Sequence, residues 1–304
     1  MKNINKEVYN IICNNLKIKE DNYIYYKSGL CSDLFVDKNK KTILKIVKWH
    51  ILTDSINNVI DKYKEKREFL DYLTSNELNI NSFVKRKEVY SIIEYSNSIY
   101  IGYLIDYLNI EEEHNKVEEI KLIKKFHELS MNYKYLSKYN WEDDFNSVSV
   151  VCKDEKLYDK MLYFKKKFDN MTKNNYGLIH FDLNKHNFVK SNNKTYIIDF
   201  DTITTGFYEM DIAGYLYSNF VIDFKNNIYI DINKRIDYLN LIKDNYKKNI
   251  LFLKRVDLFM QYRRLFLYII RKNMIDKKKQ EEIEKEIFEN NIIFPYDIDL
   301  LKKK

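Results

Sequence analysis

A change of residue pattern near position 108 constrains the fold of this chain more than any other feature. Short runs rich in β-branched and aromatic residues fill most of the first hundred positions. Beyond them, apolar residues recur at three- and four-residue spacing over most of the remaining length. The first pattern is typical of strands and the second of amphipathic helices. The sequence therefore predicts two domains: a β-rich one over residues 1–108 and a mainly helical one over 109–304.

The first domain is predicted to be a five-stranded antiparallel sheet with one inserted helix. The polar segment 37–41 can form a hairpin turn between two of its strands, and Ser96–Ser98 can form another. The expected strands cover 23–29, 33–37, 41–48 and, on either side of the second turn, the two halves of 88–108. Apolar residues at helical spacing predict the inserted helix over about 53–75.

The second domain is predicted to be helical around a short β segment. Residues 111–136 and 156–171 have apolar positions in phase for helices, and the chain from Asp211 onward also has a helical pattern. Two short strands are expected within 177–200. Together, the domains give a bilobal α+β plan, and ligands commonly bind in the cleft of such a plan.

Composition and charge exclude several classes of protein. The chain has 304 residues and a net charge of +7, but its 52 basic and 45 acidic side chains are interspersed, so no nucleic-acid partner is expected. No signal-peptide pattern begins the sequence and no apolar run is long enough to cross a bilayer, so no membrane partner is expected. Cys13, Cys31 and Cys152 are odd in number and far apart, which favours a reducing, cytoplasmic location. The oligomeric state is left open.

The segment 177–200 carries the residues best suited to chemistry. Asp182 and Asp199 each follow an apolar run, and clustered carboxylates are costly unless a positive group compensates them. Asn187 and Asp199 offer the oxygen ligands that Mg²⁺ prefers, and a hairpin with its turn at Asn192–Asn193 would bring them to one end. Asp182, in a loop, could accept the proton of a hydroxyl group that receives a phosphoryl group. The sequence thus predicts a magnesium-dependent phosphoryl-transfer site.

Three motifs in this region resemble those of a known superfamily. The segment "HFDLNKHN" at 180–187, followed by "IIDFD" at 197–201, resembles the H-x-D-x-x-x-x-N and I-D-F/W pair of the aminoglycoside phosphotransferase and choline kinase superfamily. The segment "GFYEMDIAGYL" at 206–216 is similar to that family's third motif. The resemblance covers about the whole chain in order and coarse architecture. It implies a bilobal protein-kinase-like fold and ATP- and Mg²⁺-dependent phosphorylation of a small-molecule hydroxyl.

The resemblance also implies roles for individual residues of the second domain. Asp182 corresponds to the catalytic base, and Asn187 and Asp199 correspond to the Mg²⁺ ligands. His180 corresponds to the histidine that orients the catalytic loop. Asp211 corresponds to the acid that caps the next helix and braces the backbone of that loop.

In the first domain the resemblance implies a nucleotide site. Lys45 corresponds to the lysine that contacts the phosphates, and Glu68, with Glu65 as the alternative, corresponds to the glutamate that pairs with it. A turn over the phosphates and a hinge segment that holds adenine supply the remaining cofactor-binding residues: Gly29, Ser32, Asp106, Tyr107 and Leu108.

The motifs depart from the family pattern at two positions. Phe181 stands where the family usually has glycine between the histidine and the aspartate, and His186 stands where glycine commonly precedes the asparagine. Both changes are expected to alter loop packing more than the reaction. His127 is expected to be packed, not catalytic. Asp201 is either a second metal ligand or a loop acid.

The acceptor is not determined by the sequence. An aminoglycoside needs an acidic pocket, to which segment 141–145 could contribute, and a choline-like amino alcohol would prefer aromatic walls. A sugar alcohol or a homoserine-like hydroxyl is equally compatible. Four aromatic residues are candidates for such walls, although in a chain with 27 tyrosines such residues more often belong to the core: Trp141, Phe145, Tyr215 and Tyr217. Preference for ATP over GTP is open, and the alternative function is a nucleotide-binding pseudokinase or scaffold.

Overall fold

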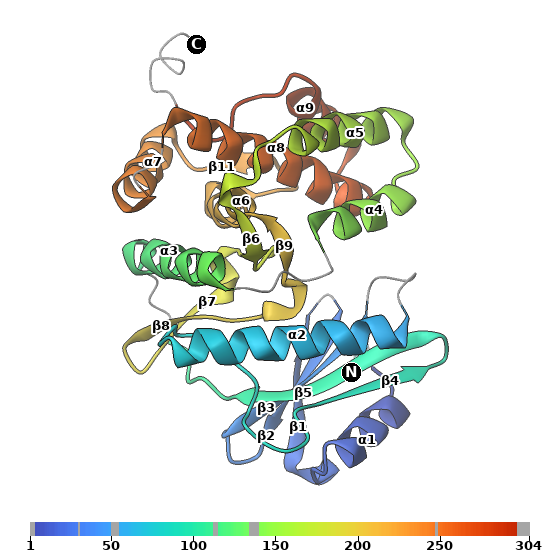
Figure 1. Cartoon of the computed structure of the whole chain (residues 1–304). Helices are drawn as coiled ribbons and strands as arrows, with labels where there is room; N and C mark the ends of the chain where they lie inside the picture. Colours follow the sequence, from blue (N-terminus) through green and yellow to red (C-terminus); the bar gives the residue numbers. More distant parts are fainter. Residues whose placement is uncertain are drawn as a thin grey trace. The chain divides into compact units, whose positions relative to one another are not determined.

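The computed structural model describes residues 4–29, 31–49, 55–111, 115–133, 140–246 and 249–296. The chain divides into two compact units, and Figure 1 shows the elements of each. The first unit comprises Met1–Glu113 together with Val189–Ile198, and the second comprises His114–Phe188 together with Asp199–Lys304. The chain therefore leaves the second unit after Phe188 and returns to it at Asp199.

The first unit contains the five-stranded antiparallel sheet that the sequence predicts. Its strand order is β1-β2-β3-β5-β4, and every neighbouring pair is antiparallel. Ser96 and Asn97, which form the tight turn before the last strand, both have positive φ. The strands are β1 (Tyr23–Ser28), β2 (Ser32–Asp37), β3 (Thr42–Lys48), β4 (Tyr90–Tyr95) and β5 (Ser98–Asp106).

Helix α1 (Lys6–Asn15), which the sequence analysis did not predict, packs on one face of this sheet. Its fully buried Ile12 joins a core cluster with Leu44 and Leu104. Gly102 of β5 makes this packing possible, because a Cβ atom there would lie 2.1 Å from Cγ2 of Ile12. The seat of α1 thus depends on the absence of a side chain at one strand position.

Helix α2 (Ile56–Ser75) matches the predicted inserted helix and packs on the other face (Figure 1). Ser55 is its N-cap and accepts a hydrogen bond from the backbone N–H of Asn58. The ring of Tyr63 lies 6.1 Å from that of Tyr103 in β5. The neighbouring positions of β5 face α1, and successive side chains of a strand point to opposite faces, so Tyr103 faces α2. The two helices therefore cover opposite faces.

The hairpin of β7 (Phe188–Ser191) and β8 (Lys194–Ile197) confirms the two short strands expected in this region. Its turn residues Asn192 and Asn193 have φ of 50° and 59°, the left-handed conformation that two-residue hairpin turns require. In sequence, Asn187 and Asp199 flank this hairpin at the ends where the chain passes between the units.

The second unit is mainly helical, as predicted, with two small β ladders. Antiparallel pairs are formed by β6 (Tyr176–Ile179) with β9 (Thr204–Phe207) and by β10 (Val221–Asp223) with β11 (Ile228–Tyr229). The helices are α3 (Lys116–Asn132), α4 (Trp141–Val151), α5 (Glu155–Asp169), α6 (Tyr208–Phe220), α7 (Ile232–Tyr246), α8 (Ile250–Arg271) and α9 (Lys277–Phe288). Single 3₁₀ turns are η1 (Glu20–Asn22) in the first unit and η2 (Lys173–Asn175), η3 (Lys185–Asn187), η4 (Phe200–Thr202) and η5 (Lys272–Met274) in the second.

Helix α8 is buried along most of its length and packs against α6, α5, α4 and α9. Helices α3 and α5 correspond to the two helices predicted at 111–136 and 156–171, whereas α4 was not predicted. Within the part of the chain that the structure describes, no helix is both long enough and apolar enough to span a bilayer.

Candidate active site

Asp182 lies in a loop whose neighbouring apolar residues are fully buried. Ile179, at the end of β6, and Leu183 are both 0% exposed, whereas the Asp182 side chain is 42% exposed. The backbone carbonyl of Asp182 accepts hydrogen bonds from the side-chain amides of Asn184 (3.0 Å) and Asn187 (2.8 Å). The loop thus presents one accessible carboxylate on a backbone held by its own polar side chains.

The side chain of Asp211, in α6, fixes the start of this loop through hydrogen bonds to its backbone. Its carboxylate is 0% exposed and accepts hydrogen bonds from the backbone N–H groups of His180 (2.9 Å) and Phe181 (2.7 Å). His127 Nε2 lies 3.2 Å from the same carboxylate, and His127 is itself buried and stacked on Tyr208, so it is a packed histidine. Asp211 therefore contacts the loop backbone, as expected, but the expectation that it also caps α6 is wrong.

That correction concerns where α6 begins. The helix starts at Tyr208, with Phe207 in the N-cap position and no side-chain cap, so Asp211 lies within the first turn. An acid in the first turn of a helix is favoured by the helix dipole, and here it is also directed at the amides of another segment. Asp211 is therefore a brace between α6 and the loop.

Two further residues on the same face of α6 contact the loop. A Cβ atom at Gly214 would lie 2.8 Å from the carbonyl oxygen of Leu183, so glycine lets the helix approach the loop backbone. Ser218 Oγ accepts a hydrogen bond of 2.8 Å from the N–H of Lys185. Spacings of three and four residues place these two positions and Asp211 on one side of the helix.

Phe181 has φ = 69°, in the left-handed region. A residue with a Cβ atom pays about 1–2 kcal/mol there, whereas glycine does not. The structure thus gives a physical reason why glycine suits the position between the motif's histidine and aspartate. His180 is 0% exposed, its ring lies 4.7 Å from that of Phe200, and its carbonyl accepts a hydrogen bond from Thr202, so it is embedded beneath the loop.

Asn187 and Asp199 carry the amide and carboxylate oxygens that magnesium ligands commonly use. Asn187 is 7% exposed, and because its amide nitrogen donates to Asp182, its side-chain oxygen is directed elsewhere. Asp199 is exposed and has left-handed φ and ψ of 66° and 54°. Among the described residues no cluster of three His, Cys, Asp or Glu side chains could hold a metal alone. Asp201, in η4, is half-buried.

Arg263 of α8 contacts the predicted base and was not identified from the sequence. Its Nη2 donates a hydrogen bond of 2.5 Å to Asp182 Oδ1, and its side chain is 21% exposed. The two residues are 81 positions apart, and an arginine in a helical run has no local signal that distinguishes it from an ordinary surface charge.

Lys45 and the two candidate glutamates belong to the first unit. Lys45 is 5% exposed and is paired in register with Tyr103, so its side chain stands on the α2 face of the sheet. On α2, Glu68 is exposed, whereas Glu65 is half-buried and its Oε2 is shielded from solvent. Burial therefore favours Glu65 over Glu68 as the partner of Lys45.

Gly29 lies in the turn between β1 and β2, Ser32 is the first residue of β2, and position 30 lies outside the described residues. The Gly29 N–H donates to the Ser32 carbonyl at 2.7 Å. A buried aspartate missed by the sequence analysis, Asp33, accepts hydrogen bonds from Ser28 Oγ (2.5 Å) and from the N–H of Ile4 (3.2 Å). The turn is thus fixed from within the sheet, while Gly29 is exposed.

The expected hinge residues Asp106, Tyr107 and Leu108 differ in how many backbone N–H and C=O groups are already hydrogen-bonded. The Tyr107 N–H donates to the Lys41 carbonyl at 2.9 Å, and the Asp106 carbonyl accepts from the side-chain amide of Asn81 at 3.1 Å. The backbone of Leu108 makes no hydrogen bond to another described residue. Leu108 therefore keeps the N–H and C=O groups that an adenine ring could use.

The aromatic residues considered as walls of an acceptor pocket belong to the core. Phe145 stacks on Tyr262, and Tyr215 donates to Glu119 at 2.6 Å. The exposures are 3% or less for all four: Trp141, Phe145, Tyr215 and Tyr217. The alternative that they are ordinary core aromatics is the correct one.

The acids at the start of α4 already have partners. Glu142 lies 3.1 Å from Lys165 Nζ, and Asp143 Oδ2 accepts from the N–H of Asn140 in a capping box. The side chain of the third acid of this segment, at position 144, lies outside what the structure describes. The two described acids serve helix packing and capping.

Solved structures with the same fold cover nearly all of the chain. The amicoumacin kinase hAmiN in complex with AMP-PNP, Ca²⁺ and Ami has a TM-score of 0.74 at 15% identity, over 93% of this chain and 92% of that one. The aminoglycoside phosphotransferase APH(2″)-IIa with gentamicin has 0.54 at 16% identity, over 95% and 97%. A choline kinase from Cryptosporidium parvum Iowa II has 0.57 at 13% identity, over 98% and 96%.

These matches confirm the predicted bilobal kinase-like fold. The identities are low, so the likeness is one of architecture. No protein-family model matches the sequence, and no curated protein matches it.

Proposed function

We propose that this protein is an ATP- and Mg²⁺-dependent phosphotransferase that phosphorylates a hydroxyl group of a small molecule. The observation that carries the proposal is the Asp182 loop: an accessible carboxylate on a backbone fixed by Asp211, Gly214 and Ser218 of α6. Phosphoryl transfer needs positioned groups more than covalent chemistry. A loop fixed at several points around one solvent-accessible carboxylate meets that need.

The reaction assigns one role to Asp182. The oxygen of the acceptor hydroxyl attacks the γ-phosphorus of ATP, the bond from that phosphorus to the β–γ bridging oxygen breaks, and ADP leaves. The proton of the hydroxyl passes to the carboxylate of Asp182, whose Oδ1 accepts a hydrogen bond from Arg263 and whose Oδ2 accepts none from another described residue. Asp182 also orients the hydroxyl for in-line attack.

The remaining predicted residues bind the nucleotide in this proposal. Asn187 and Asp199 would hold the magnesium ion, which neutralises phosphate charge when bound. Lys45 binds phosphate oxygens and is oriented by Glu65, with Glu68 as the less buried alternative. Backbone groups of the turn and the hinge bind phosphate and adenine: Gly29, Ser32, Asp106, Tyr107 and Leu108.

The solved structures with this fold support the proposal through what they bind. One holds AMP-PNP and Ca²⁺, and their acceptors range from amicoumacin to aminoglycosides. This range leaves the acceptor of the present chain to be found from its own residues. We place the activity in the cytoplasm, where ATP is abundant.

The test is ATP consumption by the purified protein, with and without Mg²⁺, against a panel of hydroxylated acceptors. We expect Asp182→Asn and Asp182→Ala to lower kcat by about 100-fold or more, the usual contribution of a general base. Asp159→Asn is the matched control, since this aspartate is exposed on α5.

Each result has a defined reading. Unchanged turnover in both Asp182 variants would remove this residue from the mechanism. A wild-type protein that binds Mg²⁺-ATP but phosphorylates no acceptor of any charge would instead be a nucleotide-binding pseudokinase.

A further inference from the structure

Arg263 places a positive charge directly against the predicted catalytic base. Its Nη2 and Asp182 Oδ1 are 2.5 Å apart, in the second unit, and its guanidinium carbon lies 5.8 Å from the ring centre of Phe266. The Arg263 side chain is partly exposed, at 21%. No motif accounts for this arginine, and the proton transfer assigned to Asp182 does not require it.

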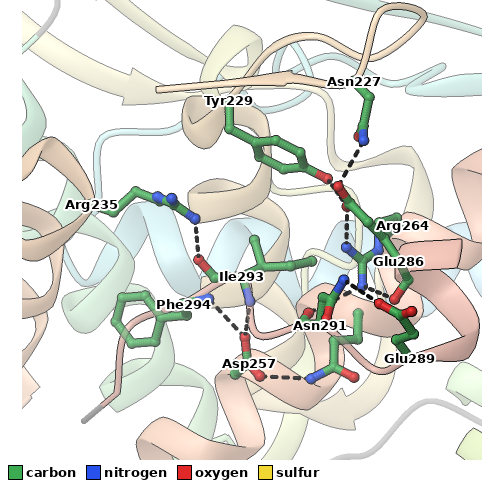
Figure 2. A network of polar contacts seen from close by, with 11 residues as sticks. Asn227, Tyr229, Arg235, Asp257, Arg264, Glu286, Glu289, Asn291, Ile293 and Phe294 are labelled. Carbon is green, nitrogen blue, oxygen red and sulfur yellow. Dashed lines mark hydrogen bonds and ion pairs between the residues drawn. The ribbon is translucent and has the colours of Figure 1, made fainter. Parts of the chain in front are cut away.

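Helix α8, which carries Arg263, is anchored to α9 and the segment after it by the next residue, Arg264. The neighbouring Arg264 is 1% exposed and donates to the Glu286 side chain of α9 at 2.6 Å and to the backbone carbonyls of Glu286 and Asn291. Figure 2 shows these contacts within a polar network. Successive helical residues differ by about 100° in direction, so anchoring Arg264 holds Arg263 toward the loop.

A second part of the same network fixes α8 about two turns before Arg264. Asp257 is 2% exposed and accepts hydrogen bonds of 2.7 Å from the N–H groups of Ile293 and Phe294 (Figure 2). Gln261 donates to the other oxygen of Asp257, also at 2.7 Å. The C-terminal segment is thereby tied to α8, and the helix is a rigid support for Arg263.

The ion pair with Arg263 changes the charge of the acceptor that Asp182 can attract. Its negative charge is what would draw a cationic acceptor, and the guanidinium already compensates it. An ammonium group close to the reacting hydroxyl would therefore meet a cation and gain little from the carboxylate. Arginine has five N–H donors in a planar fork, and Arg263 uses one of them on Asp182 among the described residues. The others suit a carboxylate.

The described residues that the sequence analysis named for a cationic acceptor have other contacts. The four candidate cage aromatics are buried in the core, and Glu142 and Asp143 are engaged by Lys165 and by a helix cap. Among the described residues, the charged group that touches the predicted base is an arginine.

We infer that Arg263 recognises the acceptor, and that the acceptor carries a carboxylate close to the hydroxyl that is phosphorylated, as a hydroxy acid or hydroxy amino acid does. The inference rests on the proposed phosphotransferase function. Asp182 Oδ2 receives the hydroxyl proton, Arg263 binds the carboxylate beside it, and the products are ADP and the phosphate ester of the acid.

The experiment compares acceptors that differ only in the carboxylate. The panel pairs L-serine, L-homoserine and D-glycerate with their carboxamides, and adds choline, ethanolamine and kanamycin as cationic acceptors. We expect at least one carboxylate to exceed its carboxamide, and every cationic acceptor, by about tenfold or more in kcat/KM. Binding of the same pairs to the protein with AMP-PNP, measured by calorimetry, gives a readout independent of turnover.

Variants of α8 assign the preference to Arg263. In Arg263→Gln the advantage of the carboxylate should fall to about twofold or less, mainly through a higher KM for the acceptor, with the KM for ATP little changed. Arg263→Lys keeps the charge without the fork and should retain part of the preference. Arg271→Gln, which removes an exposed arginine from the same helix, should retain all of it. Thermal unfolding by circular dichroism verifies that each variant is folded.

The outcomes separate this inference from the proposed function. Phosphorylation of carboxamides or cationic acceptors with equal or higher kcat/KM than the carboxylates would overturn the role of Arg263 and leave the phosphotransferase in place. An unchanged carboxylate preference in Arg263→Gln would do the same. Mg²⁺-ATP binding without phosphorylation of any acceptor would overturn both.

Discussion

Two loops of this protein, the one around Asp182 and the turn between β1 and β2, are both fixed by a buried aspartate from a neighbouring element. Asp211 accepts two backbone N–H groups of the first loop, and Asp33 accepts the Ser28 hydroxyl and the Ile4 N–H at the second. Both aspartates are 0% exposed. Both segments are thus fixed by a buried carboxylate, but they differ in the number of further contacts that hold them.

The Asp182 loop is held much more completely than the turn. Besides Asp211, α6 contributes the close approach at Gly214 and the Ser218 hydroxyl, and Asn187 closes the loop from its other end. These contacts hold Phe181 in a left-handed conformation that is unfavourable for it. In the proposed function, this difference suits a rigid loop for the reacting hydroxyl and a turn that adjusts to phosphate.

The largest effect is expected from Asp211→Asn. The asparagine can accept only one of the two loop N–H groups, and its own NH₂ group would face the other donor. We expect a loss of about 3 kcal/mol in the free energy of unfolding, measured by urea denaturation. We also expect kcat to fall about 100-fold in the folded protein because Asp182 is displaced.

Glu209→Gln is the matched control for that change. Glu209 is also 0% exposed in the first turn of α6, and its contacts include Asn175 and Arg255. It should lower stability without a specific loss of kcat. Equal effects of the two variants on kcat would mean that Asp211 acts only through stability.

A smaller and different effect is expected from Asp33→Asn. This change weakens the contacts to Ser28 and Ile4 and should cost about 2 kcal/mol of stability. Because the turn is assigned to the nucleotide, the KM for ATP should rise several-fold while kcat for the acceptor changes little. Steady-state kinetics at saturating acceptor measures both. Asp71→Asn on the exposed side of α2 serves as the control, and a selective loss of kcat in Asp33→Asn would contradict the division of roles.

The smallest effect concerns the strain at Phe181. Phe181→Ala removes the ring and keeps the Cβ atom in the left-handed conformation, whereas Phe181→Gly removes both. The glycine variant should therefore be the more stable of the two by about 1 kcal/mol, as measured by urea denaturation. In the middle of a helix or strand, the alanine variant would be the more stable of the two. An alanine variant that is the more stable would show that the loop relaxes out of the left-handed region.

Much of the fold was predictable because its signals are local. The five strands and α2 follow from runs of suitable residues separated by polar turns, and the β7–β8 hairpin follows from Asn192–Asn193. Helix α1 was missed although its N-cap Asn5 and its buried positions Val8 and Ile12 are local helix signals. Its close packing on the sheet could not be predicted, since it depends on the absent side chain of Gly102, far along the chain. The order of motif residues was also predictable, and the environment of each was not.

The amino-acid sequence alone determined which groups we propose for phosphoryl transfer and in which order they occur, because side-chain chemistry, turn preference and periodicity are properties of short segments. The tertiary structure decided which of those groups are accessible, and it brought Arg263 to Asp182 and Asp33 to Ser28 and Ile4. Such contacts depend on the packing of whole helices and strands. The direction of a side chain toward a partner 81 residues away is fixed only when that packing is complete.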